Sequence, residues 1–288
     1  MNKLTKAIIL MLISSLGYTG MALFIKLAGN DIPVIQKIFF RNLITFFVAL
    51  YLIIKRKQSF TGHKGSRGAL LLRGGMGTLG ALANFYGIEH LMLPNATIIK
   101  QLGPFFIIIF SFLFLKEKIK KFQIGALIVA FLGIIVIVGP GSHIALIPSM
   151  VELFSAVSAG IVFTCVRFLK DKESAETIVF WNSVVSIVIS LPFLIFDYTY
   201  MSPIQIIYLL LAGVCTVLGQ FGSTIAYRFA PAKDISIFSY SQVIFATIAS
   251  VIIFDAIPTL NNFIGYLIII IAAFISFLYS RKVGKTKN

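Results

Sequence analysis

One spacing is repeated in the two halves of this chain. Thirteen residues separate Pro104 from Glu117, the same number separates Gln242 from Asp255, and an apolar run fills both intervals. The two segments begin about 140 residues apart in the sequence. A pattern that returns in this way indicates two copies of one structural unit. We place the copies at residues 1–140 and 148–281.

Composition restricts these units to a membrane. Hydrophobic residues make up 58% of the chain and charged residues only 12%, too few charges to cover a soluble protein of 288 residues. The apolar residues form blocks of about 20, the length that a helix needs to cross a hydrocarbon core of about 30 Å. They do not alternate with polar residues as the strands of a membrane barrel do. We therefore expect an all-α polytopic membrane protein in the lipid bilayer.

Ten apolar blocks predict ten transmembrane helices, five in each copy. The first block follows two lysines, as in a signal peptide, but it continues to about Ala28 without a convincing cleavage site. We therefore take it as the first span. The other nine blocks cover residues 34–54, 68–88, 95–115, 122–139, 148–169, 177–196, 203–223, 235–254 and 261–279.

Positive charge lies in every second loop. Lys and Arg occur at both ends of the chain and in residues 55–67, 116–121, 170–172 and 228–233, whereas the intervening loops have neither. Cytoplasmic loops of membrane proteins carry this excess, so we expect both termini in the cytoplasm and the protein in the cell membrane (plasma or inner). The net charge of +15 therefore reports orientation, and no nucleic-acid partner is expected.

An odd number of spans in each copy makes the two copies cross the membrane in opposite senses. Inverted repeats are characteristic of secondary transporters, which bind substrate near the midplane between the repeats and alternate its access. The sequence has no Walker A pattern and no loop long enough to hold a nucleotide-binding domain. Transport would therefore run on gradients, without a cofactor.

Short motifs occur in the same order in a known family. The residues that carry the resemblance are Phe39-Phe40-Arg41, Arg73-Gly74, Phe85-Tyr86, Pro94-Asn95-Ala96, Leu102-Gly103-Pro104 and Leu115-Lys116-Glu117 with Gly125, then Ala230-Pro231-Ala232 and Phe254-Asp255-Ala256 with Pro258 and Gly265.

In this order and spacing, the motifs resemble the drug/metabolite transporter superfamily, specifically its ten-helix EamA type, over nearly the whole chain. One departure is Asp255, which stands where the family usually has Glu. The resemblance implies an exporter or importer of amino acids, nucleotide-like metabolites or other small organic solutes. It does not choose among these substrates.

Arg41, Arg73 and Lys100 are the cationic candidates inside predicted spans, where an ionisable group normally faces a cavity or a partner. Lys100 lies about 9 Å into the membrane at 1.5 Å per residue. It either meets an anionic or zwitterionic substrate in a cavity, or it reaches the interface or pairs with Glu152. Arg41 is either a cavity cation or a bond between helices. For Arg73 we favour a structural bond or a position at the cytoplasmic interface.

Uncharged polar and aromatic residues within the spans complete the candidate substrate site. Aromatic walls and a few oriented donors and acceptors suit a small organic solute. The alternative is that the aromatics belong to interfacial belts and that the amides lock helices together. These candidates are Tyr18, Asn84, Tyr86, Gln101, Trp181, Asn182, Gln220, Tyr240 and Gln242.

Several kinds of chemistry have no support in the sequence. Cys165 and Cys215 both lie in apolar blocks, so we interpret them as packing residues and expect no metal site. Paired intramembrane acids, a His-rich cluster and a Ser–His pair are not visible, so the chain is not expected to be an enzyme. The first span has Ser14 and Ser15 at its middle and no acid, which argues against proton exchange for cationic drugs through that span.

Positive groups outnumber acids within the spans, which favours a carboxylate-bearing substrate. We interpret the chain as a secondary-active transporter of an amino acid or similar solute, and we favour export over import. A lipid-carrier flippase or a cationic-drug efflux protein on the same scaffold is the alternative. Ten helices suffice for a monomer, and a homodimer is equally compatible with the sequence.

Overall fold

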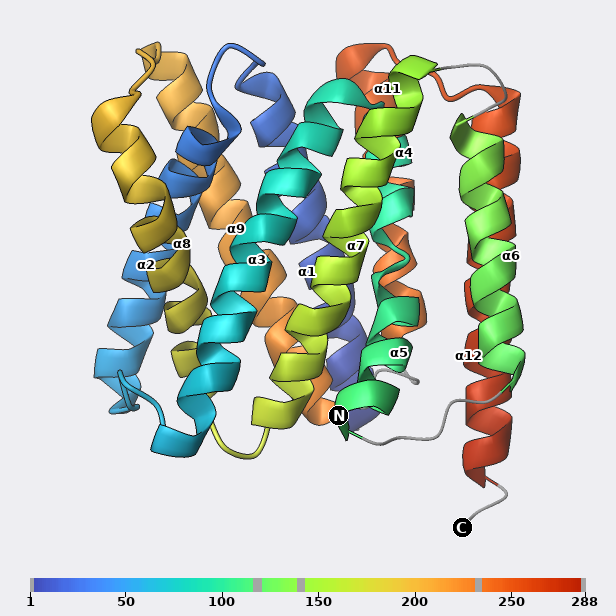
Figure 1. Cartoon of the computed structure of the whole chain (residues 1–288), viewed down its shortest axis with the longest axis horizontal. Helices are drawn as coiled ribbons and strands as arrows, with labels where there is room; N and C mark the ends of the chain where they lie inside the picture. Colours follow the sequence, from blue (N-terminus) through green and yellow to red (C-terminus); the bar gives the residue numbers. More distant parts are fainter. Residues whose placement is uncertain (1–2, 116–120, 139–142, 231–234, 286–288) are drawn as a thin grey trace.

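The computed structural model describes residues 3–115, 121–138, 143–230 and 235–285, which form helices and no strand. The helices run roughly side by side in one bundle (Figure 1). Their bounds are α1 (Lys3–Leu27), α2 (Val34–Arg56), η1 (Lys64–Ser66), α3 (Arg67–His90), α4 (Leu93–Lys100), α5 (Gly103–Leu115), α6 (Lys121–Val138), α7 (His143–Leu169), α8 (Ala175–Phe196), α9 (Pro203–Phe229), η2 (Ser236–Tyr240), α11 (Ser241–Phe254) and α12 (Leu260–Lys285).

The bundle confirms the all-α polytopic fold class. Within the described residues, seven helices, counting α4 with α5 as one, are long and apolar enough to cross a membrane. Shorter apolar helices lie at residues 124–137 and 260–275. The third predicted span, α3, is not among the apolar ones although its 24 residues reach about 36 Å. It carries Arg73 and a run of glycines, of which Gly74 and Gly80 pack closely against α8 and α7.

The fourth and ninth predicted spans are each built from two pieces. α4 ends at Lys100, and α5 begins at Gly103 after two residues in a turn. Pro104 explains this break, because proline has no N–H for the helical bond to the carbonyl of Lys100. In the second copy, η2 is a 3₁₀ segment that continues into α11 at Ser241. The Ser241 hydroxyl donates to the Phe238 carbonyl oxygen at 2.7 Å, which competes with regular helical bonding there.

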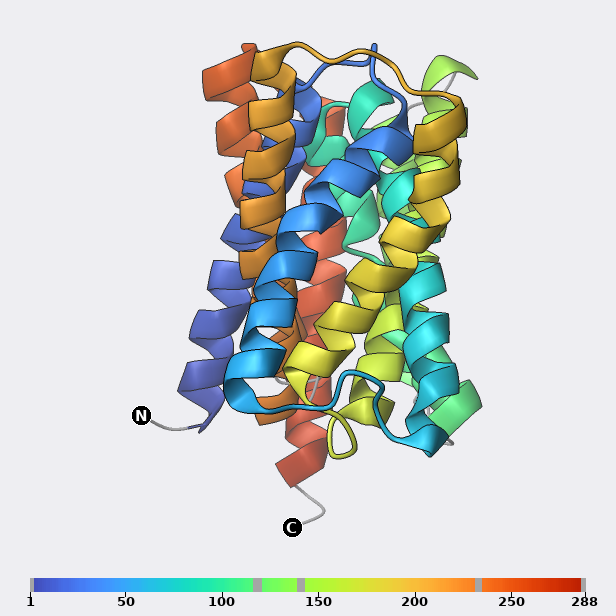
Figure 2. The same ribbon diagram turned by 90° about the vertical axis from the view of Figure 1, so that its left-hand side faces the viewer.

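Helices of the two copies are interleaved. α1 packs along α9, and its repeat equivalent α7 packs along α3, so each of these pairs takes one helix from each copy. α1 and α7 run in opposite directions, and α6 pairs with α12 at one edge of the bundle (Figure 1). Both termini lie at the same end as the loops at residues 57–66 and 170–174 (Figure 2). We call this the basic end, and the other the opposite end.

Glycines allow the close approach of α1 and α9. A Cβ atom at Gly17 would lie 2.7 Å from the backbone nitrogen of Gly219 and 2.8 Å from the carbonyl oxygen of Cys215. The Ser14 hydroxyl donates to the Gly219 carbonyl oxygen at 2.7 Å across the same contact. Small residues of this kind bring helix backbones together in membranes, where no hydrophobic force drives helices together.

Replacing Gly17 by Ala is therefore expected to destabilise the protein by about 1–3 kcal/mol, because the two backbones must separate to admit the methyl group. The measurement is thermal unfolding of the detergent-solubilised protein. Gly75→Ala on α3 is the control, since a Cβ atom there meets no atom within 4 Å. Equal melting temperatures for the two variants would contradict the packing argument.

Candidate functional site

A cavity of about 150 Å³, with polar and charged side chains set in a mostly apolar wall, lies in the middle of the bundle between the α1–α9 pair and the α3–α7 pair. α2, α4, α5, α8, η2 and α11 also contribute to its wall, whereas α6 and α12 do not among the described residues. Eight of the eleven residues predicted for a substrate site line this cavity. They are Tyr18, Arg41, Asn84, Lys100, Gln101, Asn182, Gln220 and Gln242.

The other three predicted residues lie outside the cavity. Tyr86 stacks on His90 near the opposite end, with 4.1 Å between ring centroids. Trp181 donates from Nε1 to the carbonyl oxygen of Phe60 in a loop at the basic end, at 2.9 Å. Tyr240 is buried and donates from its hydroxyl to the Gln101 carbonyl oxygen at 2.8 Å. Trp181 and Tyr240 thus join different segments of the chain, whereas the stacking of Tyr86 on His90 lies within α3.

The position of Lys100 agrees in part with each of its two predicted roles, a cation in a cavity or a partner of Glu152. It lines the cavity, and its Nζ donates to the Asn84 Oδ1 at 2.7 Å. The Asn84 Nδ2 in turn donates to the Glu152 Oε1 at 2.8 Å, so the amide links the lysine to the acid. The ammonium also lies 5.6 Å from the centroid of the Tyr18 ring, where a cation–π attraction operates.

Glu152 is fully buried behind Asn84 and packs directly against Gly87 on α3. A Cβ atom at Gly87 would collide with the Glu152 carboxylate, so the glycine makes room for the acid. The Glu152 Oε2 has no hydrogen-bond partner. The acid therefore supplies one negative charge to the Lys100 side of the cavity and does not line it.

The two arginines of the cavity carry charge without a carboxylate partner among the described residues. Arg41 lies 5.1 Å from the centroid of the Phe85 ring and donates from Nη1 to the Met21 sulfur at 3.5 Å. Arg73 donates from Nη1 to the Ile178 carbonyl oxygen at 3.0 Å. The expected structural bond of Arg73 is thus present, but this residue also lines the cavity. In both arginines, Nε is buried and has no partner.

The two interrupted spans meet at the cavity. Gln101 donates from Nε2 to the Ser239 carbonyl oxygen at 2.8 Å and to the Gln242 Oε1 at 3.0 Å. The Ser239 hydroxyl donates back to the Gln101 Oε1 at 3.0 Å. Ser239 is the repeat equivalent of Gln101, 138 residues later, so equivalent positions of the two copies are in contact at the cavity. Discontinuous helices of this kind form the substrate sites of many transporters.

Sequence reasoning missed the serines of the cavity wall. A serine in an apolar run was the signal that could have found them, although serines also serve in helix packing. Ser155 on α7 is the repeat equivalent of Ser15 on α1, 140 residues later, and both line the cavity. The remaining serines of the wall are Ser14, Ser158, Ser223 and Ser239.

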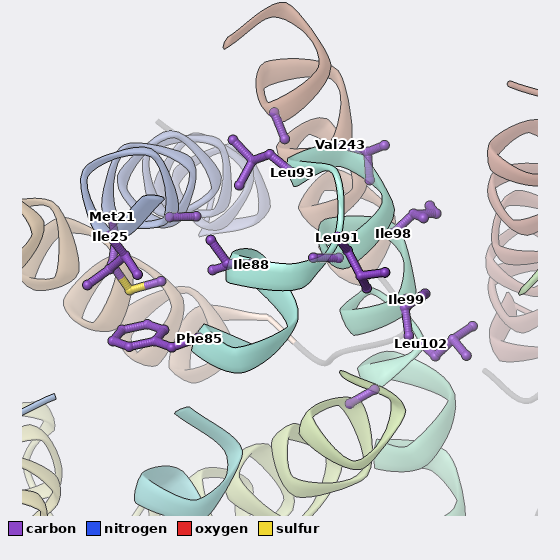
Figure 3. Packing of buried hydrophobic residues seen from close by; sticks show 14 of the residues in the cluster. Met21, Ile25, Phe85, Ile88, Leu91, Leu93, Ile98, Ile99, Leu102 and Val243 are labelled. Carbon is purple, nitrogen blue, oxygen red and sulfur yellow. The ribbon is translucent and has the colours of Figure 1, made fainter. Parts of the chain in front are cut away.

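Apolar clusters flank the cavity towards both ends of the bundle. Towards the opposite end, Met21 and Ile25 of α1 pack with Phe85 and Ile88 of α3 (Figure 3). Towards the basic end, a second cluster takes one or more residues from each of α1, α3, α7, α8 and α9. Its members include Ala7, Met11, Leu70, Leu169, Ile178 and Ala226.

Polar bonds fasten the loops beyond the basic-end cluster. The carboxylate of Glu173 accepts from the backbone nitrogen of His63 at 2.7 Å and from its Nδ1 at 3.0 Å. Burial acts to raise the pKa of the Glu173 carboxyl, but the hydrogen bonds from His63 and Ser66 outweigh it and hold the pKa below its ordinary value. Arg228 donates to the Glu173 carbonyl oxygen at 2.7 Å, which joins α9 to this loop.

Among the described residues, no group of three His, Cys, Asp or Glu could hold a metal ion. The polar groups of the cavity are instead hydroxyls, amides and cations. A polytopic helical bundle with such a central cavity is typical of a membrane transporter, and the comparisons that follow indicate a transporter and not an enzyme. The chain belongs to the EamA-like transporter family, which matches residues 5–139 and 147–278. The resemblance found in the sequence is thereby confirmed.

Comparison with individual proteins agrees with this class. The chain is 29% identical to the pseudopaline exporter CntI of Pseudomonas aeruginosa (strain UCBPP-PA14) over 274 residues, covering 94% of this chain and 96% of that protein. It is 26% identical to solute carrier family 35 member G1 of Homo sapiens over 264 residues, covering 86% and 72%. A solved crystal structure shares the fold with a TM-score of 0.71 at 15% identity, over 97% of this chain and 99% of that chain.

Proposed function

We propose that this protein is a secondary-active exporter of a small, carboxylate-bearing organic metabolite. The observation that carries the proposal is the charge of the cavity wall. Lys100, Arg41 and Arg73 line one cavity, and Glu152, through Asn84, is the only acid among the described residues that is bonded into their network. Buried cations without counter-ions are costly, so the substrate is expected to supply the missing negative charge.

Export is the direction that the similarity to an exporter supports. The positive loops favour cytoplasmic termini in a cell membrane, and the basic end is then the cytoplasmic end. An anion is also driven out of a cell by an interior-negative potential, since each charge gains about 2.3 kcal/mol per 100 mV. For a solute with net negative charge, the membrane potential alone would therefore power this transport, without a nucleotide or a cofactor.

The repeats at residues 1–140 and 148–281 supply a mechanism of alternating access. The cavity lies where equivalent residues of the two copies meet, at Gln101 and Ser239. Rocking of the α1–α9 pair against the α3–α7 pair would open one apolar cluster while the other stays packed. This scheme requires one polypeptide, so a monomer suffices and a homodimer remains compatible with it.

A cationic-drug efflux protein is the second candidate, on the strength of the aromatic Tyr18 and Phe163 in the wall. The three cations disfavour it, because like charges in a buried site repel. A lipid-carrier flippase would share the anionic recognition but needs a cavity that opens sideways to lipid. We therefore keep the soluble metabolite as the proposal.

The test is counterflow in liposomes that contain the purified protein. Labelled amino acids and other carboxylates are expected to exchange. For carboxylates with net negative charge, a valinomycin-imposed potential, negative on the cytoplasmic face, is expected to drive net movement away from that face. Labelled cationic drugs and a labelled lipid carrier form the comparison arms. Exchange of cations or of the lipid carrier alone would overturn the proposal.

A further inference from the structure

We propose that the substrate carries at least two carboxylates, held apart at the two ends of an elongated solute. The inference rests on the proposed function and names its substrate class more closely. The cations of the cavity form two separate positions. We call Lys100 with Arg41 the Lys100 pole, and Arg73 the Arg73 pole.

The separation of the two poles follows from residue positions along helix α3. Asn84 of α3 holds the Lys100 ammonium at 2.7 Å, and the next residue, Phe85, lies under the Arg41 guanidinium. Both cations therefore belong to one level of the cavity. Arg73 lies on the same helix eleven residues earlier, about 16 Å along its axis. Its bond to the Ile178 carbonyl oxygen, near the start of α8, places the guanidinium towards the basic end.

Each pole has unused capacity to bind an anion. Arg41 and Arg73 each bond through Nη1, and a guanidinium presents five donors in a fork that matches a carboxylate. The Lys100 ammonium has three donors, of which one is directed to Asn84. Both poles line the same cavity, so a single solute can reach them together.

The charge balance leads to the same substrate class. Three cations and the one acid linked to them through Asn84 leave an excess of two positive charges at the cavity. An amino-acid zwitterion has no net charge and one carboxylate, so it would occupy one pole and leave the other cation bare. A solute with two separated carboxylates compensates both poles. One compact dianion, such as a phosphate monoester, would compensate the charge at one pole only.

The test is a series of unbranched α,ω-dicarboxylic acids of increasing length, each paired with its monoamide. The monoamide keeps the length and removes one charge. Binding is measured by thermal stabilisation of the purified protein, which rises with ligand concentration over Kd. We expect affinity to increase along the dicarboxylic series until both poles are reached, and long dicarboxylic acids to bind at least tenfold more tightly than their monoamides.

Arg73→Gln is expected to lower the affinity of a long dicarboxylic acid at least tenfold, to that of its monoamide, while the monoamide binds as before. Arg73→Lys, which keeps the charge, is expected to retain most of the preference. Arg167→Gln is the matched control, since Arg167 bonds to Ser111 and does not line the cavity. It should leave the whole series unchanged.

The outcomes separate this inference from the proposed function. Equal affinity of the dicarboxylic acids and their monoamides would overturn the two-pole inference and leave a carboxylate transporter standing. Equal loss of both ligands in Arg73→Gln would overturn it as well. Tighter binding of a phosphate monoester than of any dicarboxylic acid would overturn it in favour of one compact dianion. Binding of no anion at all would overturn the proposed function itself.

Discussion

Replacing Lys100 by Met is expected to lower the rate of carboxylate counterflow roughly 10- to 100-fold. Among the described residues, Lys100 is the only lysine that lines the cavity. Its ammonium group lies between the Asn84 amide and the Tyr18 ring. A charged hydrogen bond in such a site contributes roughly 1.5–3 kcal/mol, and its loss with the charge itself corresponds to one or two orders of magnitude in affinity. The measurement is the initial rate of counterflow in liposomes at matched protein content.

A second variant distinguishes a binding role from a structural one. Lys100→Met leaves the buried Glu152 carboxylate without the cation that reaches it through Asn84, and an uncompensated buried charge destabilises a protein. Glu152→Gln in the same chain removes that charge. The double variant is expected to recover the melting temperature of the wild type but not its transport.

Two control variants test whether the position and the charge of Lys100 account for the loss of transport. Lys55→Met removes an exposed lysine that lies 5.5 Å from the Tyr51 ring, outside the cavity, and should retain full transport. Lys100→Arg keeps the charge on a longer, planar group and should retain part of the activity. Recovery of transport in the double variant would show that Lys100 serves only to compensate Glu152.

The sequence was sufficient to predict the all-α polytopic fold and several polar residues of the cavity wall, because both depend on what a bilayer tolerates. A cation or an amide in an apolar run must face protein or water, and eight of the eleven predicted residues do line the cavity. The break at Gln101 was also foreseeable in principle, because a Gly-Pro pair marks the end of a helix.

The rotation of each helix could not be predicted in the same way. Trp181 occupies the repeat position of Arg41, yet Asn182, one residue later and about 100° further round α8, is the one that lines the cavity. Tyr86 and Asn84 differ similarly on α3. Composition does not determine which of these side chains points to the cavity. Both faces of the two helices are apolar, so the rotation of each helix depends on the helix packed against it. Arg73 shows a further difficulty, because one side chain both braces α8 and lines the cavity.

Breaking the ion pair between Lys37 and Glu89 is expected to destabilise the fold by about 3–5 kcal/mol, because removal of one partner leaves a bare buried charge. Lys37 is 0% exposed, pairs with the Glu89 carboxylate and donates to the Gly29 carbonyl oxygen. Lys37 and Arg41 are four residues apart on one face of α2, but only Arg41 reaches the cavity. The pair thus fastens α2 to α3 next to the helix segments that hold the Lys100 pole.

The measurement is a double-mutant cycle on unfolding free energy with Lys37→Met, Glu89→Gln and both together. We expect the double variant to be more stable than the sum of the single effects predicts, since neither charge remains to be buried alone. Glu176→Gln is the comparison, because its partner Arg56 is 59% exposed and exposed pairs contribute about 1 kcal/mol or less. Additive effects at Lys37 and Glu89 would show that the two residues act independently. The register of α2 on α3 would then depend on apolar packing such as that of Ile38 and Phe85, which are both fully buried in the same cluster.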